Sequence, residues 1–436
     1  MKNYTLLILY FIYFISGDLI SSGDHFEDTK CSGKILILQI VGCVLNHSPE
    51  YKVAKYEIGA LEGKKKVAAY LFPSNPYLTI TQAGRKGTGG DFLNPENGIF
   101  YNGEILISQE IFLSAQRSTR LKIANSELNS SERKLLAIER NTISEAFNAV
   151  IYYQFAREET ILYESLYKIS EDIYRVISTR SQKGLSPPIE ADLAESEKFR
   201  AFRALQIARR NQQKSKINLT VMMGIKNELP LEIIDEFNDP KYRKQDQSDL
   251  LQFALQNRPE VESNEFLVQA NVKKLELYHN EKIPNPIFSA YVQKDGFNEN
   301  VVGGRISLPL RVWRDQSGEI HEGKYRLEQA KSIAEVNRHT ISLEILKAYS
   351  DYESLKYELD SYSPELIKKI ETNMEFLKKA LLLGQVNLKE ALILQQSFLN
   401  VKINLLGTRL QYALAGIELL RASGEPIIRL KESSND

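Results

Sequence analysis

The longest regular feature of the hydrophobic pattern is a helical period in two segments, at about 114–182 and 317–383. A helix of this length spans ~100 Å, which is far more than a globular domain requires. Its apolar stripe is narrow and charged residues flank it, so such a helix needs partner helices. The pattern predicts long coiled-coil hairpins, with an ordinary long helical bundle as the alternative. In the second segment the stripe consists of Leu355, Leu359, Tyr362, Leu366, Ile370, Leu377 and Leu381.

Between the helical segments the period of the pattern changes to two residues. Strands are predicted at 286–294 and 301–312, and weaker versions of the same alternation occur at 77–82 and 104–113. Strands of ~9–11 residues with aromatic residues near their ends fit a membrane β-barrel. A small soluble sheet that a neighbouring element covers fits the alternation equally well. The aromatic residues that could border a membrane are Tyr77, Phe100, Tyr101, Phe288, Phe297 and Trp313.

Two prolines, Pro284 and Pro286, end a helix that is predicted over 249–282. Proline has no N–H donor, and it biases the preceding residue towards an extended backbone. We therefore expect the chain to change from helix to strand here and to become helical again at about residue 317.

The two halves of the chain share one pattern. Pro49 and Pro259 lie 210 residues apart, whereas Gly184 and Gly384 lie 200 residues apart. Each half reads as helix, strand, loop, strand, very long helix, tight turn and helix, which indicates a tandem internal repeat. The ten extra residues of the first half are expected in a glycine-rich loop at 84–98.

The predicted domains follow from this repeat. The first repeat covers 35–240 with a tip turn at 183–188, and the second covers 241–425 with a tip turn at 383–387. A C-terminal tail at 426–436 completes the chain. The fold class is mainly α with a small β part.

The N-terminus has the pattern of a secretory signal. Lys2 precedes ten aliphatic or aromatic residues at 6–15, and small residues follow them. A charged region, a short apolar region and small residues are typical of a cleaved signal, and a spanning helix needs ~20 apolar residues. We expect residues 1–17 to be a signal peptide and the mature protein to be exported.

The two cysteines, Cys31 and Cys43, could pair in an oxidising compartment, although two cysteines make no disulfide framework. The residues Ile-Val-Gly-Cys at 40–43 resemble a lipid-attachment motif. They lie inside a predicted helix and far from the apolar N-terminal segment, which favours a buried cysteine.

Composition excludes several classes of function. Lys and Arg number 56, as do Asp and Glu, so the charge balance does not point to nucleic acid. A hydrophobic content of 43% argues against disorder, and only 14 Pro and 23 Gly suit long uninterrupted elements. The five histidines are scattered, and neither a phosphate-binding loop nor a hydrolase nucleophile motif occurs. We expect no catalytic residue, no metal site and no cofactor.

If the strands lie in a membrane, one chain cannot complete the structure. Unpaired backbone N–H and C=O groups at a sheet edge cost several kcal/mol each in lipid, and the smallest membrane barrels use about eight strands. Four strands are too few, so copies of the chain would have to share one barrel.

Several short motifs surround the strands and the helix turns. They are LQNRPEV at 255–261, VQA at 268–270, PNP at 284–286, GGRISLPL at 303–310 and the turns around Gly184 and Gly384. Together these motifs resemble those of the TolC-like outer-membrane efflux channels, the outer-membrane factors. The resemblance covers about 35–425, and the sequence around the strands is most similar to the branch that serves heavy-metal efflux pumps.

The resemblance implies a homotrimer in which four strands per chain form a twelve-stranded barrel in outer-membrane lipid. Long helical hairpins would form a periplasmic tunnel of twelve helices. A periplasmic adaptor would join their tips to an inner-membrane pump, and the similarity to the heavy-metal branch implies a pump for metal cations. The protein would then be a passive export duct and not an enzyme. The alternative from a different class is a periplasmic helical-hairpin scaffold or adaptor without a pore.

The resemblance also assigns roles at the tips. The turns match the adaptor-docking tips of the family, although turn chemistry alone explains the same residues, with Ser186 and Asn387 as helix caps. The docking candidates are Gly184, Leu185, Ser186, Gly384, Gln385 and Val386.

A carboxylate follows each tip glycine by six residues, at Glu190 and Glu390. In the family, acidic residues here face the pore, so three chains would present two rings of negative charge that favour cations. Asn387 and Glu390 also fit a capping box, which is the structural alternative for Glu390. The family usually has Asp at these positions, so the pore geometry could differ here.

Overall fold

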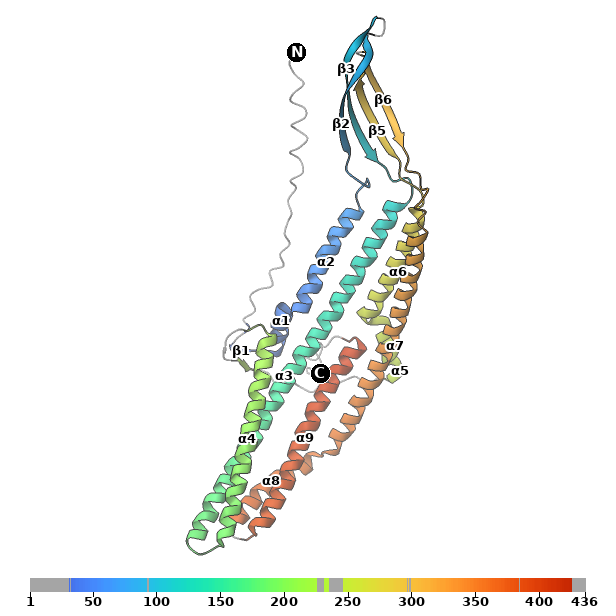
Figure 1. The fold of residues 1–436 in the computed structure, drawn as a ribbon. Helices are drawn as coiled ribbons and strands as arrows, with labels where there is room; N and C mark the ends of the chain where they lie inside the picture. Colours follow the sequence, from blue (N-terminus) through green and yellow to red (C-terminus); the bar gives the residue numbers. More distant parts are fainter. Residues whose placement is uncertain are drawn as a thin grey trace.

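The structure is a computed structural model, and it is an elongated molecule with a sheet at one end and long helices below it (Figure 1). The predicted signal peptide at 1–17 and the predicted tail at 426–436 lie outside the described residues. The structure describes residues 31, 33–91, 94–225, 231–234, 246–295, 297, 299–383 and 385–425.

The chain is mainly helical with a small strand part, as predicted. The first half contains β1 (Gly33–Ile35), α1 (Ile37–His47), α2 (Pro49–Ala68), β2 (Tyr77–Asp91), β3 (Asn94–Glu110), α3 (Gln116–Gln182) and α4 (Pro188–Met222). The second half contains β4 (Leu231–Ile233), α5 (Gln247–Asn257), α6 (Pro259–Asn280), β5 (Ile287–Lys294), β6 (Asn300–Ser307), α7 (Ser317–Ser361), α8 (Pro364–Leu382) and α9 (Leu388–Ser423). None of the helices in the described ranges is both long and apolar enough to cross a membrane.

The prediction of one long helix over 317–383 was wrong, because the structure divides it into α7 and α8. Pro364 cannot donate a backbone hydrogen bond to the preceding turn. Ser363 adopts an extended backbone, and its hydroxyl accepts from the N–H of Leu366 at 3.2 Å, which caps α8. The equivalent helix of the first half, α3, is continuous over its 67 residues.

The helix predicted over 249–282 is likewise divided, into α5 and α6. Arg258 lies between them with φ −72° and ψ 126°, and Pro259 is the first residue of α6. A residue before proline avoids the helical region, so the break is local. The predicted continuous helix was therefore wrong at this point.

The predicted loop at 84–98 was also wrong, because β2 and β3 continue through it as one hairpin. Gly84 pairs with Tyr101 and Lys86 pairs with Ile99. The Tyr101 ring lies over Gly84, with Cε1 3.6 Å from the position a Cβ would take there. An aromatic ring that covers a glycine supports strand geometry despite the missing side chain. In contrast, the strand predicted to reach 312 ends at Ser307, which pairs with the first residue of β5, Ile287.

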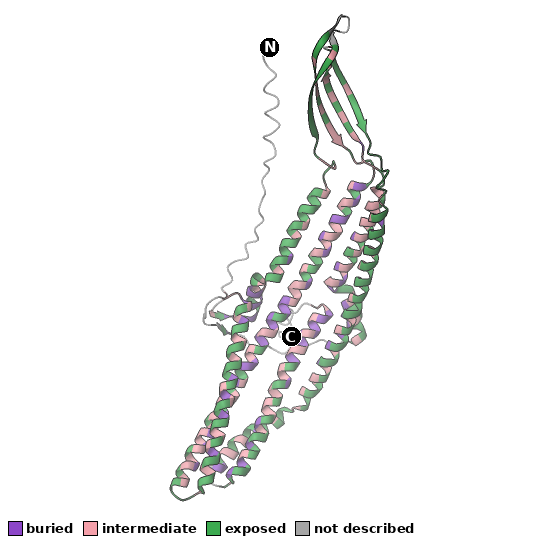
Figure 2. Cartoon of the chain, in the orientation of Figure 1, coloured by how far each residue is buried: buried purple, intermediate pink, exposed green. Residues whose placement is uncertain are grey.

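Buried residues form narrow stripes along the helices, and much of each helix surface is exposed (Figure 2). One core joins α1, α3, α4 and α9, and a second joins α5, α6, α7 and α9. The division into repeats at 35–240 and 241–425 stays a prediction. Both Gly224 and Gly424, which follow α4 and α9, have positive φ angles of 71° and 82°.

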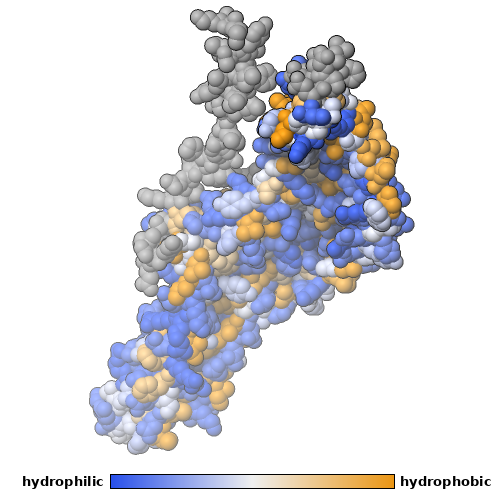
Figure 3. Space-filling view, turned by 45° about the horizontal axis from the view of Figure 1, so that its top comes forward, coloured by the Kyte–Doolittle hydropathy of each residue, from blue (hydrophilic) through white to orange (hydrophobic). Residues whose placement is uncertain are grey.

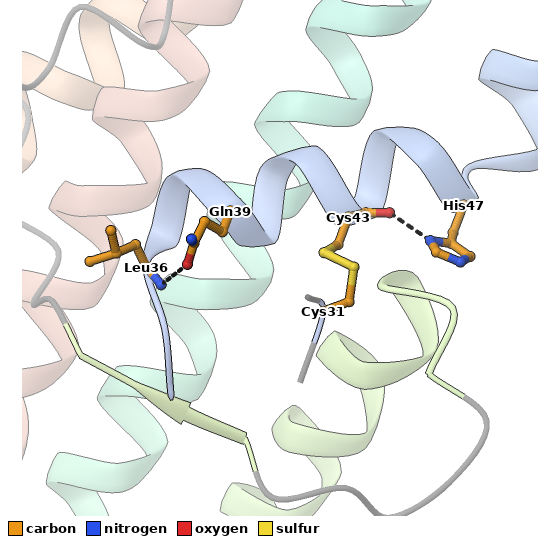
Figure 4. The surroundings of a disulfide bond; sticks show 5 residues. All are labelled: Cys31, Leu36, Gln39, Cys43 and His47. Carbon is orange, nitrogen blue, oxygen red and sulfur yellow. Dashed lines mark hydrogen bonds between the residues drawn. A yellow bond between two sulfur atoms is a disulfide. The ribbon is translucent and has the colours of Figure 1, made fainter. Parts of the chain in front are cut away.

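A disulfide joins Cys31 to Cys43, which is fully buried in α1 (Figure 4). The bond ties the segment before β1 to the helix that follows it, and β1 pairs in parallel with β4. Disulfides persist in oxidising compartments, which agrees with an exported chain. The Cys43 sulfur is engaged in this bond and is not a free thiol for lipid attachment.

Candidate functional site

The sheet at the end of the molecule has the antiparallel order β2-β3-β5-β6. β2 and β6 are its edges, and within the described residues neither has a second partner strand. Edge strands present unpaired N–H and C=O groups that another strand can bind. One protomer therefore has two open edges, one on each side.

One face of this sheet is apolar and exposed, and we call it the outward face. In β5 the exposed residues alternate strictly with half-buried ones, and Val292 is 53% exposed. The space-filling view shows apolar side chains gathered along this end of the molecule (Figure 3). Because directly paired residues point to the same side, the strand register places these residues on one face. The exposed apolar residues of this face are Leu78, Ile80, Ile99, Tyr101, Ile105, Ile107, Phe288, Val292, Val302 and Ile306.

The opposite face of the same four strands is mostly polar, and the apolar residues Leu106, Ile287 and Val301 also lie on it. Ser108 and Ser289 share a hydrogen bond of 2.9 Å between their hydroxyls. Arg305 donates to Glu104 at 3.4 Å and lies over the ring of Tyr291. A sheet with one apolar and one polar face, neither covered by another layer, fits the wall of a water-filled membrane barrel.

The helices below the sheet also carry exposed apolar residues, at the two sides of the protomer. α4 packs on α3, and α7 packs on α6 and α9. The helical repeat places the exposed residues of α4 and α7 opposite the faces by which each helix packs. On α4 they are Ile189, Leu193, Phe199, Phe202, Ile207, Ile217 and Val221, and on α7 they are Tyr325, Ile333, Val336, Leu343, Leu346 and Tyr357.

The first hairpin tip has the backbone expected of a tight helix end. Gly184 has a φ angle of 72°, a left-handed conformation that suits glycine. The N–H of Leu185 donates to the carbonyl of Arg180 at 2.8 Å, and the Leu185 side chain is 67% exposed. The prediction that Ser186 caps α4 was wrong, because Pro187 is the cap residue and Pro188 begins the helix.

The second tip is similar where the structure describes it, although Gly384 lies outside the described residues. The N–H of Gln385 donates to the carbonyl of Ala380 at 2.9 Å. Asn387 caps α9, as predicted, and its side chain accepts from the N–H of Lys389 at 2.9 Å. Glu390 is exposed in the first turn of α9.

The structure brings the two tips together. Val386 of the second tip packs against a cluster contributed by α3, α4, α8 and α9. Glu190 lies half-buried in the first turn of α4, close to the same end of the molecule. The buried residues of the cluster are Ile173, Ile177, Ala194, Leu381, Leu388 and Ala391.

A buried ionic network joins four helices about midway along the molecule, and the sequence reasoning missed it. Arg258 is 3% exposed, and it donates to Glu344 at 2.7 Å and to Glu260 at 3.0 Å. Arg140 of α3 also binds Glu260, and Arg421 of α9 lies 3.5 Å from Glu344. The adjacent Arg-Pro-Glu residues were noticeable in the sequence, but their partners lie 80 or more residues away.

Glu260 makes this network sensitive to acid. Burial by itself raises the pKa of the Glu260 carboxyl, but the hydrogen bond from Arg258 and the charge of Arg140 outweigh it and lower the pKa to about 2. A carboxyl with a lowered folded pKa stabilises the fold above its unfolded pKa of 4.5. This contribution is lost as the pH falls from 4.5 through 2.

We predict that Glu260→Gln lowers the free energy of unfolding by about 3 kcal/mol at pH 7, and that the difference from wild type disappears near pH 2. Denaturant unfolding of the purified protein at both pH values measures this. The matched control is Glu265→Gln on the same helix, whose partner Arg338 is about half exposed, so its effect is small. An equal loss at both pH values would contradict the assignment to the charge of Glu260.

Comparison with known proteins agrees with this geometry. A family model described as outer membrane efflux protein matches residues 44–225. No curated protein matches the sequence at a significant level. Solved structures with a similar fold include CusC, which is 13% identical with a TM-score of 0.72 and covers 91% of this chain and 93% of its own.

Two further channels have the same fold. The Campylobacter jejuni outer membrane channel CmeC is 16% identical, with a TM-score of 0.69 over 89% of this chain and 85% of its own. The open state of the Neisseria gonorrhoeae outer membrane channel MtrE is 14% identical, with a TM-score of 0.70 over 89% of both chains. At these identities the likeness concerns the fold alone.

The two-faced sheet on long helical hairpins is a TolC-like fold. Residues 44–225 thus match the family of outer membrane efflux proteins, and the fold of the chain is that of the solved channels.

Proposed function

We propose that the protein is a passive export duct through the outer membrane and that it functions as a homotrimer. The observation that carries this proposal is the sheet with an exposed apolar face, a polar face and two unpaired edges. In lipid such edges have to be paired, so β2 of one protomer would pair with β6 of the next. The polar face would then line the pore.

The exposed stripes of α4 and α7 support the same assembly. They lie on opposite sides of one protomer, so a ring of copies would bury the α4 stripe of each against the α7 side of its neighbour. A head-to-tail interface that closes on itself gives a cyclic oligomer. The 67 residues of α3, at ~1.5 Å each, would extend such a tunnel ~100 Å from the membrane.

Fractionation of cells tests the proposal. The protein should sediment with outer membranes, resist extraction by salt, and run as a heat-sensitive trimer on gels. A water-soluble monomer that needs no detergent would refute the duct and favour a periplasmic scaffold without a pore.

We further propose that a periplasmic adaptor docks at the tips around Gly184, Leu185 and Val386 and connects the duct to an inner-membrane pump. The exposure of Leu185 and the packing of both tips at one end support a shared docking surface. The sequence resemblance supports a pump for heavy-metal cations. A strain that lacks the gene should then be more sensitive to metal cations. Unchanged metal tolerance would rule out metal cations as the exported substrate.

We propose Glu190 and Glu390 as gate residues, since both lie in first helical turns beside the tips. Three protomers would place six carboxylates near the tunnel mouth, where they favour cations. Glu190→Ala combined with Glu390→Ala should raise single-channel conductance several-fold and reduce cation preference in planar bilayers. Glu375→Ala, an exposed carboxylate of α8, is the control. Unchanged conductance and selectivity in the double variant would rule out the gate.

A further inference from the structure

The outward face of the sheet changes character at one row of residues. The three rows closest to the helices contain Phe288, Ala290 and Val292 of β5 and their apolar neighbours. The next row contains Gln82, Gly103, Lys294 and Asn300, which are directly paired from strand to strand. The continuous apolar band therefore ends at the row of Lys294, and beyond it the outward face of β3 carries Tyr101 and Ile99, with Ile99 paired to Lys86.

The long hairpin of β2 and β3 continues beyond this row. The pairing of β5 with β3 ends at Gly103, so residues 83–91 of β2 and 94–102 of β3 extend past the last residue of β5. Tyr101, 68% exposed, is the next outward residue of β3, and Lys86 is the second outward residue of β2 after Gln82. Lys86 lies four positions after Gln82 along β2, which corresponds to a rise of ~13 Å.

The two faces of the sheet carry different charged residues. Among the described side chains of the four strands, Lys86 and Lys294 are the charged residues of the outward face. Both are exposed, and neither forms an ion pair within the described residues. The charged residues of the inward face are Arg85, Glu104, Glu110 and Arg305.

The acids closest to Lys294 belong to the turn that joins β5 to β6. Asp295 and Glu299 have the strand parity of the inward face, opposite to Lys294. The Asp295 carboxylate accepts from the N–H groups of Phe297 and Glu299 at 2.9 and 3.0 Å, which fixes it within the turn. The outward lysines are therefore not neutralised by these acids.

We propose that Lys294, Tyr101 and Lys86 form a binding site for the phosphate groups of anionic lipid in the outer leaflet. This proposal rests on the proposed function, because it requires the outward face to contact lipid. Lysine stems can lie along apolar surface while the ammonium group reaches the headgroups, and an aromatic ring with a polar tip favours the same depth. The compact ammonium charge suits phosphate, and a trimer would carry six such lysines.

The apolar rows beside Lys294 favour a lipid over a soluble phosphate. An anchored lipid would contact Val292 and Val302 with its chains while its phosphate meets the lysines. A free phosphate would gain only the two charges, which salt screens at an exposed site.

Reconstitution of the purified full-length protein into vesicles tests the site. The vesicles contain phosphatidylcholine with a small fraction of either phosphorylated lipid A or the same lipid after phosphatase treatment. Lipid retained by the protein after mild detergent extraction is quantified by mass spectrometry. The variant Lys86→Gln combined with Lys294→Gln should retain the phosphorylated lipid about tenfold less than wild type. Arg85→Gln, on the same strand but the inward face, is the matched control and should behave as wild type.

Three outcomes separate the possibilities. Enrichment of the phosphorylated lipid that the double variant loses and the control keeps would support the site. Insertion without such enrichment, or with equal loss in the Arg85→Gln control, would overturn the site and leave the duct intact. Failure of the wild-type protein to insert in any vesicle would overturn the duct and the site together. Inorganic phosphate, added as competitor, should not displace the lipid; displacement would contradict an anchored ligand.

Discussion

Replacement of Gly184 by arginine is expected to abolish export while the trimer still forms. Gly184 lies at the exposed end of the first hairpin with a φ angle of 72°, and a Cβ atom there would have no atom within 4 Å apart from its chain neighbours. Arginine would therefore leave the core intact, at a cost of ~1–2 kcal/mol for the left-handed backbone. It would place a bulky charge in the proposed docking surface, where an unpaired charge opposes binding. We expect export to fall by more than about tenfold in a cell-based efflux assay.

The conservative variant Gly184→Asn is the control for this experiment. Asparagine tolerates the left-handed conformation and adds neither bulk nor net charge comparable to arginine. It should export nearly as well as wild type. Normal efflux with Gly184→Arg would show that the first tip is not a docking surface, whereas loss of trimer on gels would show a folding defect instead.

Replacement of Val292 by arginine is expected to prevent stable insertion into the outer membrane. Val292 is half-exposed in the third apolar row of the outward face, one row from Lys294, between Ile105 and Val302 on the neighbouring strands. Arginine on the lipid face of a membrane barrel costs roughly 2–4 kcal/mol at the bilayer centre and about 0–1 kcal/mol near the interfaces, so we expect roughly 1–2 kcal/mol at this depth. Three protomers triple this cost to roughly 3–6 kcal/mol per trimer. Outer-membrane fractionation and heat-sensitive migration measure the result.

The adjacent residue provides a matched control. Gln293 lies on the inward polar face, because successive residues of a strand point to opposite sides. Gln293→Arg should therefore leave insertion unchanged. If the two arginine variants inserted equally well, the outward face would not contact lipid. That result would refute a membrane barrel in this protein.

The sequence by itself determined the features that depend on local periodicity. Alternation at 286–294 placed Val292 and Gln293 on opposite faces, and the structure has the same alternation of exposure in β5. The helical stripe at 114–182 predicted α3, which the structure confirms with 67 residues. The glycine at 184 predicted a positive φ angle, since few other residues adopt one without strain. The gate residues Glu190 and Glu390 stay predictions.

Only the tertiary structure decided how distant segments meet. The breaks before Pro259 and Pro364 are different, because they are local effects of residues that the sequence displays, and the continuing helical period on both sides concealed them. The extension of β2 and β3 depends on pairing between Gly84 and Tyr101, where an aromatic ring compensates for a residue that favours loops. The ionic network of Arg258 needs partners from α3, α7 and α9 that no local pattern identifies. Periodicity reports which side of an element is buried, whereas the partner on that side is decided by packing across the chain.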